Sequence, residues 1–179
     1  MSNSACLRAV GLACAAALLS VGCGASGSPR ELTALQQAPL HTFNEHEVDA
    51  YLKWLHSHEP DISQRVTHLA RRNHGEFPYE LHDPDPLYCL SAGDCVTFVE
   101  QIYAMALSND WPAFFRTLQR IRYRGGHIGI RTRNHFTEAD WNVNNRWLFE
   151  DMTESLALGN VVTYQQRIDR RSFFQQFSV

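Results

Sequence analysis

The sequence predicts an α+β fold in which helices come first and short strands follow. Between residues 44 and 122, apolar residues recur at spacings of three and four, the periodicity of amphipathic helices. After the glycine pair at 125–126, Ile128, Ile130 and Thr132 alternate with Gly129, Arg131 and Arg133, which is the period of a strand. This order of elements is typical of an antiparallel sheet packed against a helix.

Residues 1–22 are predicted to be a signal peptide of the lipoprotein type. They carry one charge, Arg8, and then an apolar run from Ala9 to Leu19 that is too short to anchor stably in a bilayer. The end of this segment resembles a bacterial lipoprotein box, in which Cys23 is lipidated. The alternative is an ordinary cleaved signal with an incidental Cys23. We expect an exported protein, held by a lipid anchor at the periplasmic face of a bacterial membrane.

Residues 23–42 are predicted to be a flexible linker, and residues 43–179 the folded domain. The linker is polar, lacks a sustained period and starts with a run of glycine and serine typical of a tether. The net charge of the chain is −3, which argues against a nucleic-acid partner.

Four helices are predicted in the first part of the domain. Each start is marked by a side chain that can accept hydrogen bonds from the first helical turn: Asn44, Asp61, Asp94 and Asp110. Pro60 and Gly75 are expected to end the first two helices. The third helix is apolar on most of its surface, so it is expected to be buried against the sheet.

Short strands are expected in the second part of the domain, around residues 128–133, 136, 147–152 and 160–168. Residues 172–177 fit either a last strand or a short helical turn.

Cys95 falls in the first turn of the third predicted helix. The helix dipole and the unpaired N–H groups there favour a thiolate, as a cysteine nucleophile requires. Cys89 lies six residues away, and a Cys89–Cys95 disulfide in an exported protein is the alternative, which would block the nucleophile. A zinc site from these cysteines and His82 is a weaker hypothesis because paired-ligand spacing is missing. We expect no metal and no other cofactor.

A cysteine nucleophile needs a base, usually a histidine. The chain has nine histidines, of which His135 is the strongest candidate. It follows the predicted strand, and a sheet packed on the cysteine helix could place it opposite the thiol. His82, in the loop before Cys95, and His127, beside the glycine turn, remain alternatives.

Three segments occur in the order and approximate spacing of one family: Asp94–Glu100, Ile121–Gly126, and Arg133–Phe136 with Asp140-Trp141 and Asn144-Asn145. Over residues 78 to 155 the chain resembles the N-acetylmuramoyl-L-alanine amidase-like proteins, relatives of the NlpC-type cell-wall peptidases. The resemblance implies a papain-like α+β fold, with the cysteine helix packed on an antiparallel sheet. It makes Cys95 the nucleophile and His135 the base.

The resemblance also suggests an orienting residue and a place for Tyr79. Asn145 is preferred as the third catalytic residue, because a neutral amide can accept from the imidazole; Asp140 and Asn144 are alternatives. Pro78-Tyr79 resembles a Pro-Tyr pair upstream of the family's cysteine, which implies that Tyr79 lies near the active site.

The implied activity is hydrolysis of the bond between N-acetylmuramic acid and L-alanine, in peptidoglycan or in muropeptides. We expect the protein to be a monomer. One alternative moves the cut into the stem peptide, as a D-glutamyl-diamino acid endopeptidase. Another is a non-catalytic envelope lipoprotein with a Cys89–Cys95 disulfide.

A basic stretch lies between Asp110 and Glu138, where no acidic residue occurs. Arginine pairs well with carboxylates such as those of stem peptides. The arginines expected to face the cleft are Arg122, Arg124, Arg131 and Arg133. The predicted substrate-binding residues are Tyr79, Arg131, Arg133 and Asp140.

Overall fold

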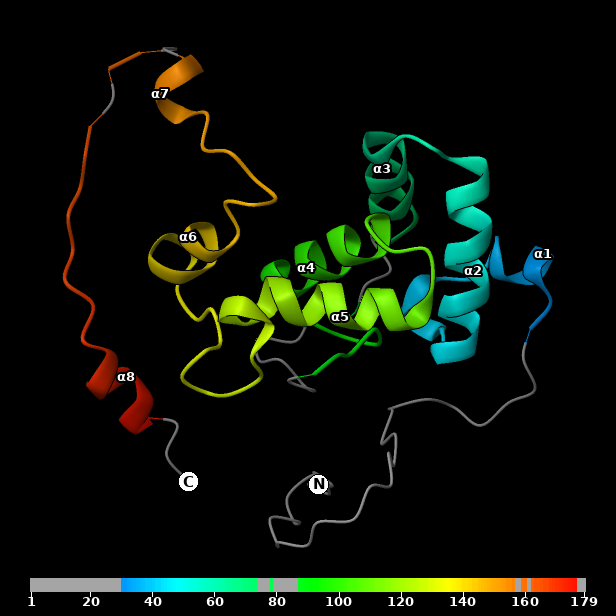
Figure 1. The fold of residues 1–179 in the computed structure, drawn as a ribbon, viewed down its shortest axis with the longest axis horizontal. Helices are drawn as coiled ribbons and strands as arrows, with labels where there is room; N and C mark the ends of the chain where they lie inside the picture. Colours follow the sequence, from blue (N-terminus) through cyan, green and yellow to red (C-terminus); the bar gives the residue numbers. More distant parts are fainter. Residues whose placement is uncertain (1–29, 74–77, 79–86, 157–158, 161, 177–179) are drawn as a thin grey trace, which may run out of the picture. The chain divides into compact units, whose positions relative to one another are not determined.

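The computed structural model describes residues 30–73, 78, 87–156, 159–160 and 162–176 (Figure 1). The chain divides into two compact units, 1–133 and 134–179. The described residues form helices and no strand; an isolated antiparallel bridge joins Tyr123 and Arg133. The predicted α+β fold, with an antiparallel sheet packed on the Cys95 helix, is therefore wrong for the described part of the chain.

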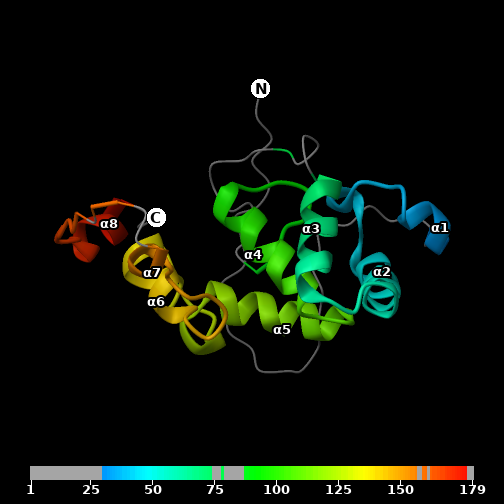
Figure 2. The same cartoon turned by 90° about the horizontal axis from the view of Figure 1, so that it is seen from above.

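The first unit is built from helices around one apolar core. The helices are α1 (Leu32–Leu35), α2 (Glu45–His58), α3 (Ile62–Asn73), α4 (Cys95–Ala106) and α5 (Trp111–Arg122), with the 3-10 turns η1 (Leu40–Thr42) and η2 (Arg124–Gly126). Helix α4 packs against both α3 and α5 (Figure 1, Figure 2). Side chains at most 2% exposed fill the space between the helices: Leu52, Leu55, Leu69, Met105, Phe114 and Leu118.

The predicted helix starts are confirmed by capping hydrogen bonds. Asn44 Oδ1 accepts from Glu47 N at 3.0 Å and the Glu47 carboxylate accepts from Asn44 N at 3.0 Å, which is a complete capping box. The carboxylates of the other three caps accept from backbone N–H groups three residues on: Asp61 from Gln64, Asp94 from Thr97, and Asp110 from Ala113. Helix α2 ends just before Pro60, as predicted. The stop expected at Gly75 lies outside the described residues.

The predicted strand at 128–133 is instead part of a closed loop. Gly125 and Gly126 adopt positive φ angles of 65° and 76°, which turn the chain directly after α5. Arg124 N donates to the Thr132 carbonyl at 2.8 Å and closes the loop. Ile128 and Ile130 are 54% and 61% exposed, so the alternating pattern has no buried face with which to stabilise a strand.

The second unit contains short helical elements, and the described residues of 136, 147–152 and 160–168, where further strands were expected, form turns and irregular segments instead. The helical elements are η3 (Thr137–Trp141, a π-helical turn), α6 (Asn142–Asn144), α7 (Thr153–Leu156) and α8 (Arg170–Gln176). The Trp141 ring stacks on the Phe149 ring with centroids 5.2 Å apart, which stabilises a turn rather than an extended segment. In 162–169 every residue is exposed, so no apolar face is buried there. Helix α8 confirms the helical alternative for residues 172–176.

The end of the predicted linker carries secondary structure. Residues 30–42 contain α1 and η1, and both Leu35 and Leu40 are 1% exposed. Arg72 on α3 donates to the carbonyls of Leu35 and Ala38, which ties this segment to the helical core. Residues 1–29, with the predicted signal and Cys23, lie outside the described part. Among the helices that the structure does describe, none has the length and apolar character to cross a membrane.

An ion pair at the start of α2 should make the free energy of unfolding depend on pH in the acid range. The Arg30 guanidinium lies 2.7 Å from the Glu47 carboxylate, and its hydrogen bond is the main cause that lowers the pKa of Glu47 from 4.5 to about 2. Because the folded pKa is the lower one, the pair stabilises the fold above about pH 4.5 and loses this effect as the pH falls toward 2. Urea unfolding at pH 5, 4, 3 and 2.5 measures the effect. Between pH 5 and 2.5, we expect the free energy of unfolding to fall by about 2 kcal/mol more in the wild type than in Glu47→Gln. Parallel pH curves for the two proteins would contradict the assignment.

Candidate functional site

Cys95 is the first residue of α4, and its free thiol is exposed. The preceding Asp94 fixes the helix start, because its Oδ1 accepts from Thr97 N at 2.8 Å and from Thr97 Oγ1 at 3.0 Å. First-turn N–H groups precede the helical hydrogen-bond ladder and carry the positive end of the helix dipole. The predicted position of Cys95 at a capped helix start is confirmed.

The loop that enters α4 is held by side chains from two helices. Gln119 on α5 donates from Nε2 to the Leu87 carbonyl at 2.7 Å. Gln101 on α4 donates to the Cys89 carbonyl, and Gly93 N donates to the Pro78 carbonyl at 3.1 Å. The backbone that leads to Cys95 is therefore fixed on both sides of Cys89. Tyr79, which follows Pro78, lies outside the described residues, so its substrate-binding role stays a prediction.

Cys89 and Cys95 are both free thiols in the structure, in different surroundings. The Cys89 side chain is 4% exposed, and its Sγ lies 3.2 Å from Ser91 Oγ. Cys95 is exposed at the surface. Cys89, the partner of Cys95 in the disulfide hypothesis, is thus buried, and its thiol contacts the hydroxyl group of Ser91.

A buried ionic cluster lies within the first unit, on the helix that carries Cys95. The carboxylate of Glu100 on α4 lies 3.0 Å from Arg122 Nε and 3.1 Å from Arg133 Nη1. The side chains of Glu100 and Arg122 are 0% exposed, and that of Arg133 is 15% exposed. Arg133 Nη1 also donates to the Arg122 carbonyl at 3.1 Å. The cluster therefore ties α4 to the end of α5 and to the last residue of this unit.

This cluster changes the interpretation of the basic stretch. Arg122 was expected to face a cleft, but it is fully buried, so that expectation is wrong. The Arg133 guanidinium binds Glu100 and lies 5.6 Å from the centre of the Tyr123 ring. Arg124 and Arg131 are exposed.

The structural role of Glu100 was not predicted from the sequence. Two signals could have revealed it: an acidic residue inside an otherwise apolar helix, and a run of arginines without a nearby acid.

His135 belongs to the second unit and is exposed. Its ring centroid lies 5.2 Å from that of Phe173 on α8. The backbone N–H of Phe136, the residue after His135, donates to the Asp140 carboxylate at 3.3 Å. The same carboxylate forms an ion pair with Arg170 at 2.5 Å. Asp140 therefore holds the turn that follows His135, and its predicted contact with substrate stays a prediction.

The asparagines near His135 are tied to the same unit. Asn144 Nδ2 donates to the Oδ1 of Asn134, the buried neighbour of His135, at 2.7 Å. Asn145 is fully buried, and its carbonyl accepts from Leu148 N and Phe149 N at 2.8 and 3.0 Å. His135 and the candidate orienting residues thus belong to one unit, and Cys95 belongs to the other.

Comparison with known proteins identifies the family. The family described as N-acetylmuramoyl-L-alanine amidase-like (AmiA-like) matches residues 80–177, more than half of the chain. The chain belongs to this amidase-like family. The matched range includes Cys95, His135 and Asn145.

A solved structure supports the assignment of this amidase-like chain. Protein LPG0564 from Legionella pneumophila strain Philadelphia 1, described by the family name DUF1460, has 28% sequence identity and a TM-score of 0.53. The similarity covers 63% of this chain and 42% of that protein, so the chain spans less than half the length of its relative. Among curated proteins, none matches the chain significantly.

A zinc site in the amidase-like chain would need several ligands close together. Within the described ranges, no three or more His, Cys, Asp or Glu side chains gather as a metal would require. His82, a ligand of the weaker zinc hypothesis, lies outside those ranges.

Proposed function

We propose that this amidase-like protein is a cysteine-dependent hydrolase that cleaves the N-acetylmuramoyl–L-alanine bond of peptidoglycan or muropeptides. Membership of the family supports a cell-wall amidase type of function. The observation that carries the cysteine mechanism is the exposed free thiol of Cys95 at the capped start of α4, within the residues that the family matches.

In the proposed mechanism, His135 removes the thiol proton and Cys95 attacks the lactyl amide carbon. Backbone N–H groups of the first turn of α4 stabilise the oxyanion that forms. The C–N bond then breaks, and His135 returns the proton to the leaving L-alanine amine. Water, deprotonated by His135, hydrolyses the thioester and releases the lactyl carboxylate and the thiol. Asn145 keeps the imidazole in orientation.

The proposed substrate-binding residues differ in whether their charged groups already form ion pairs within the protein. Arg131 is exposed, so its guanidinium can meet a stem-peptide carboxylate. Arg133 and Asp140 would share their groups with Glu100 and Arg170 respectively. Tyr79 completes the proposed set. Export and a lipid anchor at Cys23 are part of the proposal and depend on the leader sequence alone.

Product masses test the proposed bond. Purified protein is incubated with defined muropeptides, and the products are identified by mass spectrometry. We expect a sugar that ends in the lactyl acid, together with an intact stem peptide whose L-alanine amine is free. A cut after D-glutamate would instead identify the endopeptidase, and an unchanged muropeptide would favour the non-catalytic lipoprotein. A Cys95→Ala sample run in parallel should give no product.

A further inference from the structure

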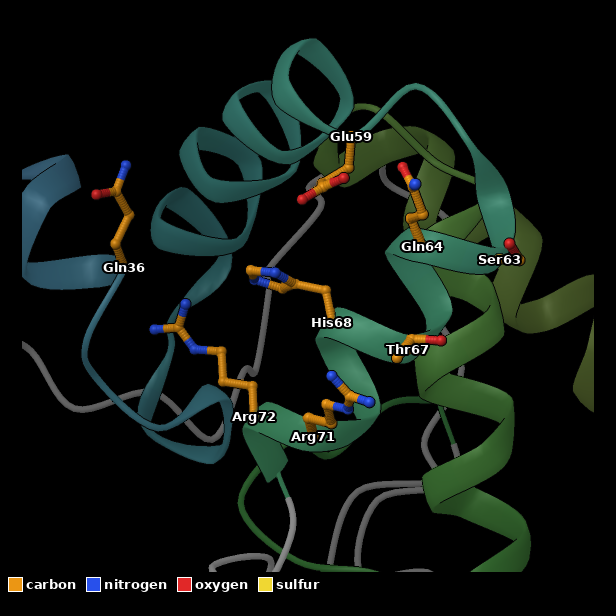
Figure 3. Close-up of a pocket in the computed structure, with 8 residues that line it drawn as sticks. All are labelled: Gln36, Glu59, Ser63, Gln64, Thr67, His68, Arg71 and Arg72. Carbon is orange, nitrogen blue, oxygen red and sulfur yellow. The ribbon is translucent and has the colours of Figure 1, made fainter.

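A pocket of about 630 Å³ lies in the first unit, along α3 and the end of α2 (Figure 3). Polar or charged residues line it throughout, and none of them belongs to α4. In Figure 3, the Glu59 side chain extends from the end of α2 toward His68, which projects from α3. Arg71 and Arg72 follow on the same helix. The pocket therefore presents an acidic group across from basic and hydrogen-bonding groups.

His68 belongs to a hydrogen-bonded group behind the pocket, together with Tyr51 and Arg72. Arg72 Nη1 donates to the Tyr51 hydroxyl oxygen at 2.9 Å, and His68 Nε2 lies 2.7 Å from the same oxygen. Burial, followed by the charge of Arg72, lowers the pKa of His68, so the ring is neutral near pH 7. When the Tyr51 hydroxyl donates to Nε2, the histidine proton resides on Nδ1. In that tautomer His68 has a free ring N–H with which to donate a hydrogen bond.

The two arginines contribute in different ways. Arg72 is held in place by the carbonyls of Leu35 and Ala38, and it lies 4.7 Å from the centre of the Tyr51 ring. The N–H groups of Arg72 donate to groups within the protein, so its guanidinium contributes a positive charge at a fixed position beside the pocket. Arg71 is exposed and its guanidinium is available to an anion. Glu59 is close enough for its charge to raise the pKa of His68, against the larger effects of burial and Arg72.

We propose that this pocket binds an α-amino acid centre, with the carboxylate at His68 and Arg71 and the ammonium group at Glu59. Bidentate pairing with arginine suits a carboxylate, and a carboxylate on the opposite wall suits an ammonium group. A phosphate would meet the like charge of Glu59, and a simple cation would meet two arginines. Only a ligand that carries both charges close together satisfies both walls. Free amino acids have such a centre, and so does the side-chain end of a diamino acid within a peptide.

Binding measurements that involve no hydrolysis test this proposal separately from the proposed activity. The ligands are alanine, N-acetylalanine, alanine methyl ester and a stem peptide that contains diaminopimelate, titrated by calorimetry and NMR. We expect alanine to bind at least about tenfold more tightly than either derivative that lacks one charge. Tighter binding of the peptide than of alanine would identify a peptide ligand, and the reverse order would identify a free amino acid.

Variants on opposite walls sharpen the test. Glu59→Gln should weaken alanine binding at least about tenfold but leave N-acetylalanine unchanged, because that derivative has no ammonium group. Arg71→Gln should weaken both ligands. Arg116→Gln, which changes an exposed arginine on α5, is the matched control and should bind like the wild type. No binding by any ligand, or equal binding of alanine and its two derivatives, would overturn the proposal.

Discussion

Replacing Glu100 with alanine is expected to destabilise the protein by about 3–5 kcal/mol, because it leaves arginine charges buried without their carboxylate. Glu100 and Arg122 are both 0% exposed, and their charged atoms lie 3.0 Å apart. Arg133 adds a second guanidinium at 3.1 Å from the same carboxylate. Removing one member of a buried ion pair costs more than removing the pair, since the remaining charge must be desolvated alone.

Urea unfolding followed by circular dichroism measures this effect. Glu31→Ala, which removes an exposed glutamate, is the matched control and should change stability by less than about 0.5 kcal/mol. If Glu100→Ala does not fold, the double change Glu100→Met with Arg122→Met provides the measurement. It replaces the pair with apolar side chains of similar size, so it should fold and be more stable than Glu100→Ala. If the free energy of unfolding of Glu100→Ala lies within about 1 kcal/mol of the wild-type value, the cluster does not stabilise the fold.

Local signals in the sequence were sufficient to predict where the helices begin. The capping side chains Asn44, Asp61, Asp94 and Asp110 act within three residues of their own positions, so a short window contains all the information. The same holds for Cys95, whose place in the first turn of α4 follows directly from Asp94.

The failed predictions depended on contacts that are distant in sequence or on burial. The pattern at 128–133 resembled a strand, but Ile128 and Ile130 are exposed and the loop closes on itself through Thr132. Alternation predicts a strand only if one face is buried, which the sequence of this segment does not specify.

Helix α4 shows that apolar periodicity also fails to predict which polar residues are buried. Its polar residues Thr97, Glu100 and Gln101 were the exceptions on an apolar helix, yet all three are buried, whereas Val99 is 37% exposed. Each of these polar side chains makes specific contacts, because Thr97 bonds with the cap residue, Gln101 holds the entering loop, and Glu100 binds two arginines. Periodicity measures apolar character and therefore assigns the wrong face when a buried face is polar.

Replacing Cys95 with alanine is expected to lower kcat/KM for muropeptide cleavage by at least about 10⁴-fold, because covalent attack has no other nucleophile in the proposed mechanism. The side chain is exposed at the helix start, so the free energy of unfolding should change by less than about 0.5 kcal/mol. Cys89→Ala is the matched control. It removes the other free thiol of the described residues, from the core, and should keep activity while losing some stability. Cys95→Ala with full activity would rule out the mechanism.

Thiol labelling connects this kinetic result to the oxidation state of the two cysteines in the protein isolated from its source. Because Cys95 is exposed and Cys89 is 4% exposed, iodoacetamide should modify Cys95 in the native protein and Cys89 only after unfolding. Loss of activity should follow modification of Cys95 with the same rate constant, since one event causes both. A protein isolated from its own compartment with Cys89 and Cys95 joined would resist labelling at both positions until it is reduced. That result, together with inactivity toward muropeptides, would indicate a non-catalytic binding protein, whereas labelling matched by inactivation assigns the nucleophile to Cys95.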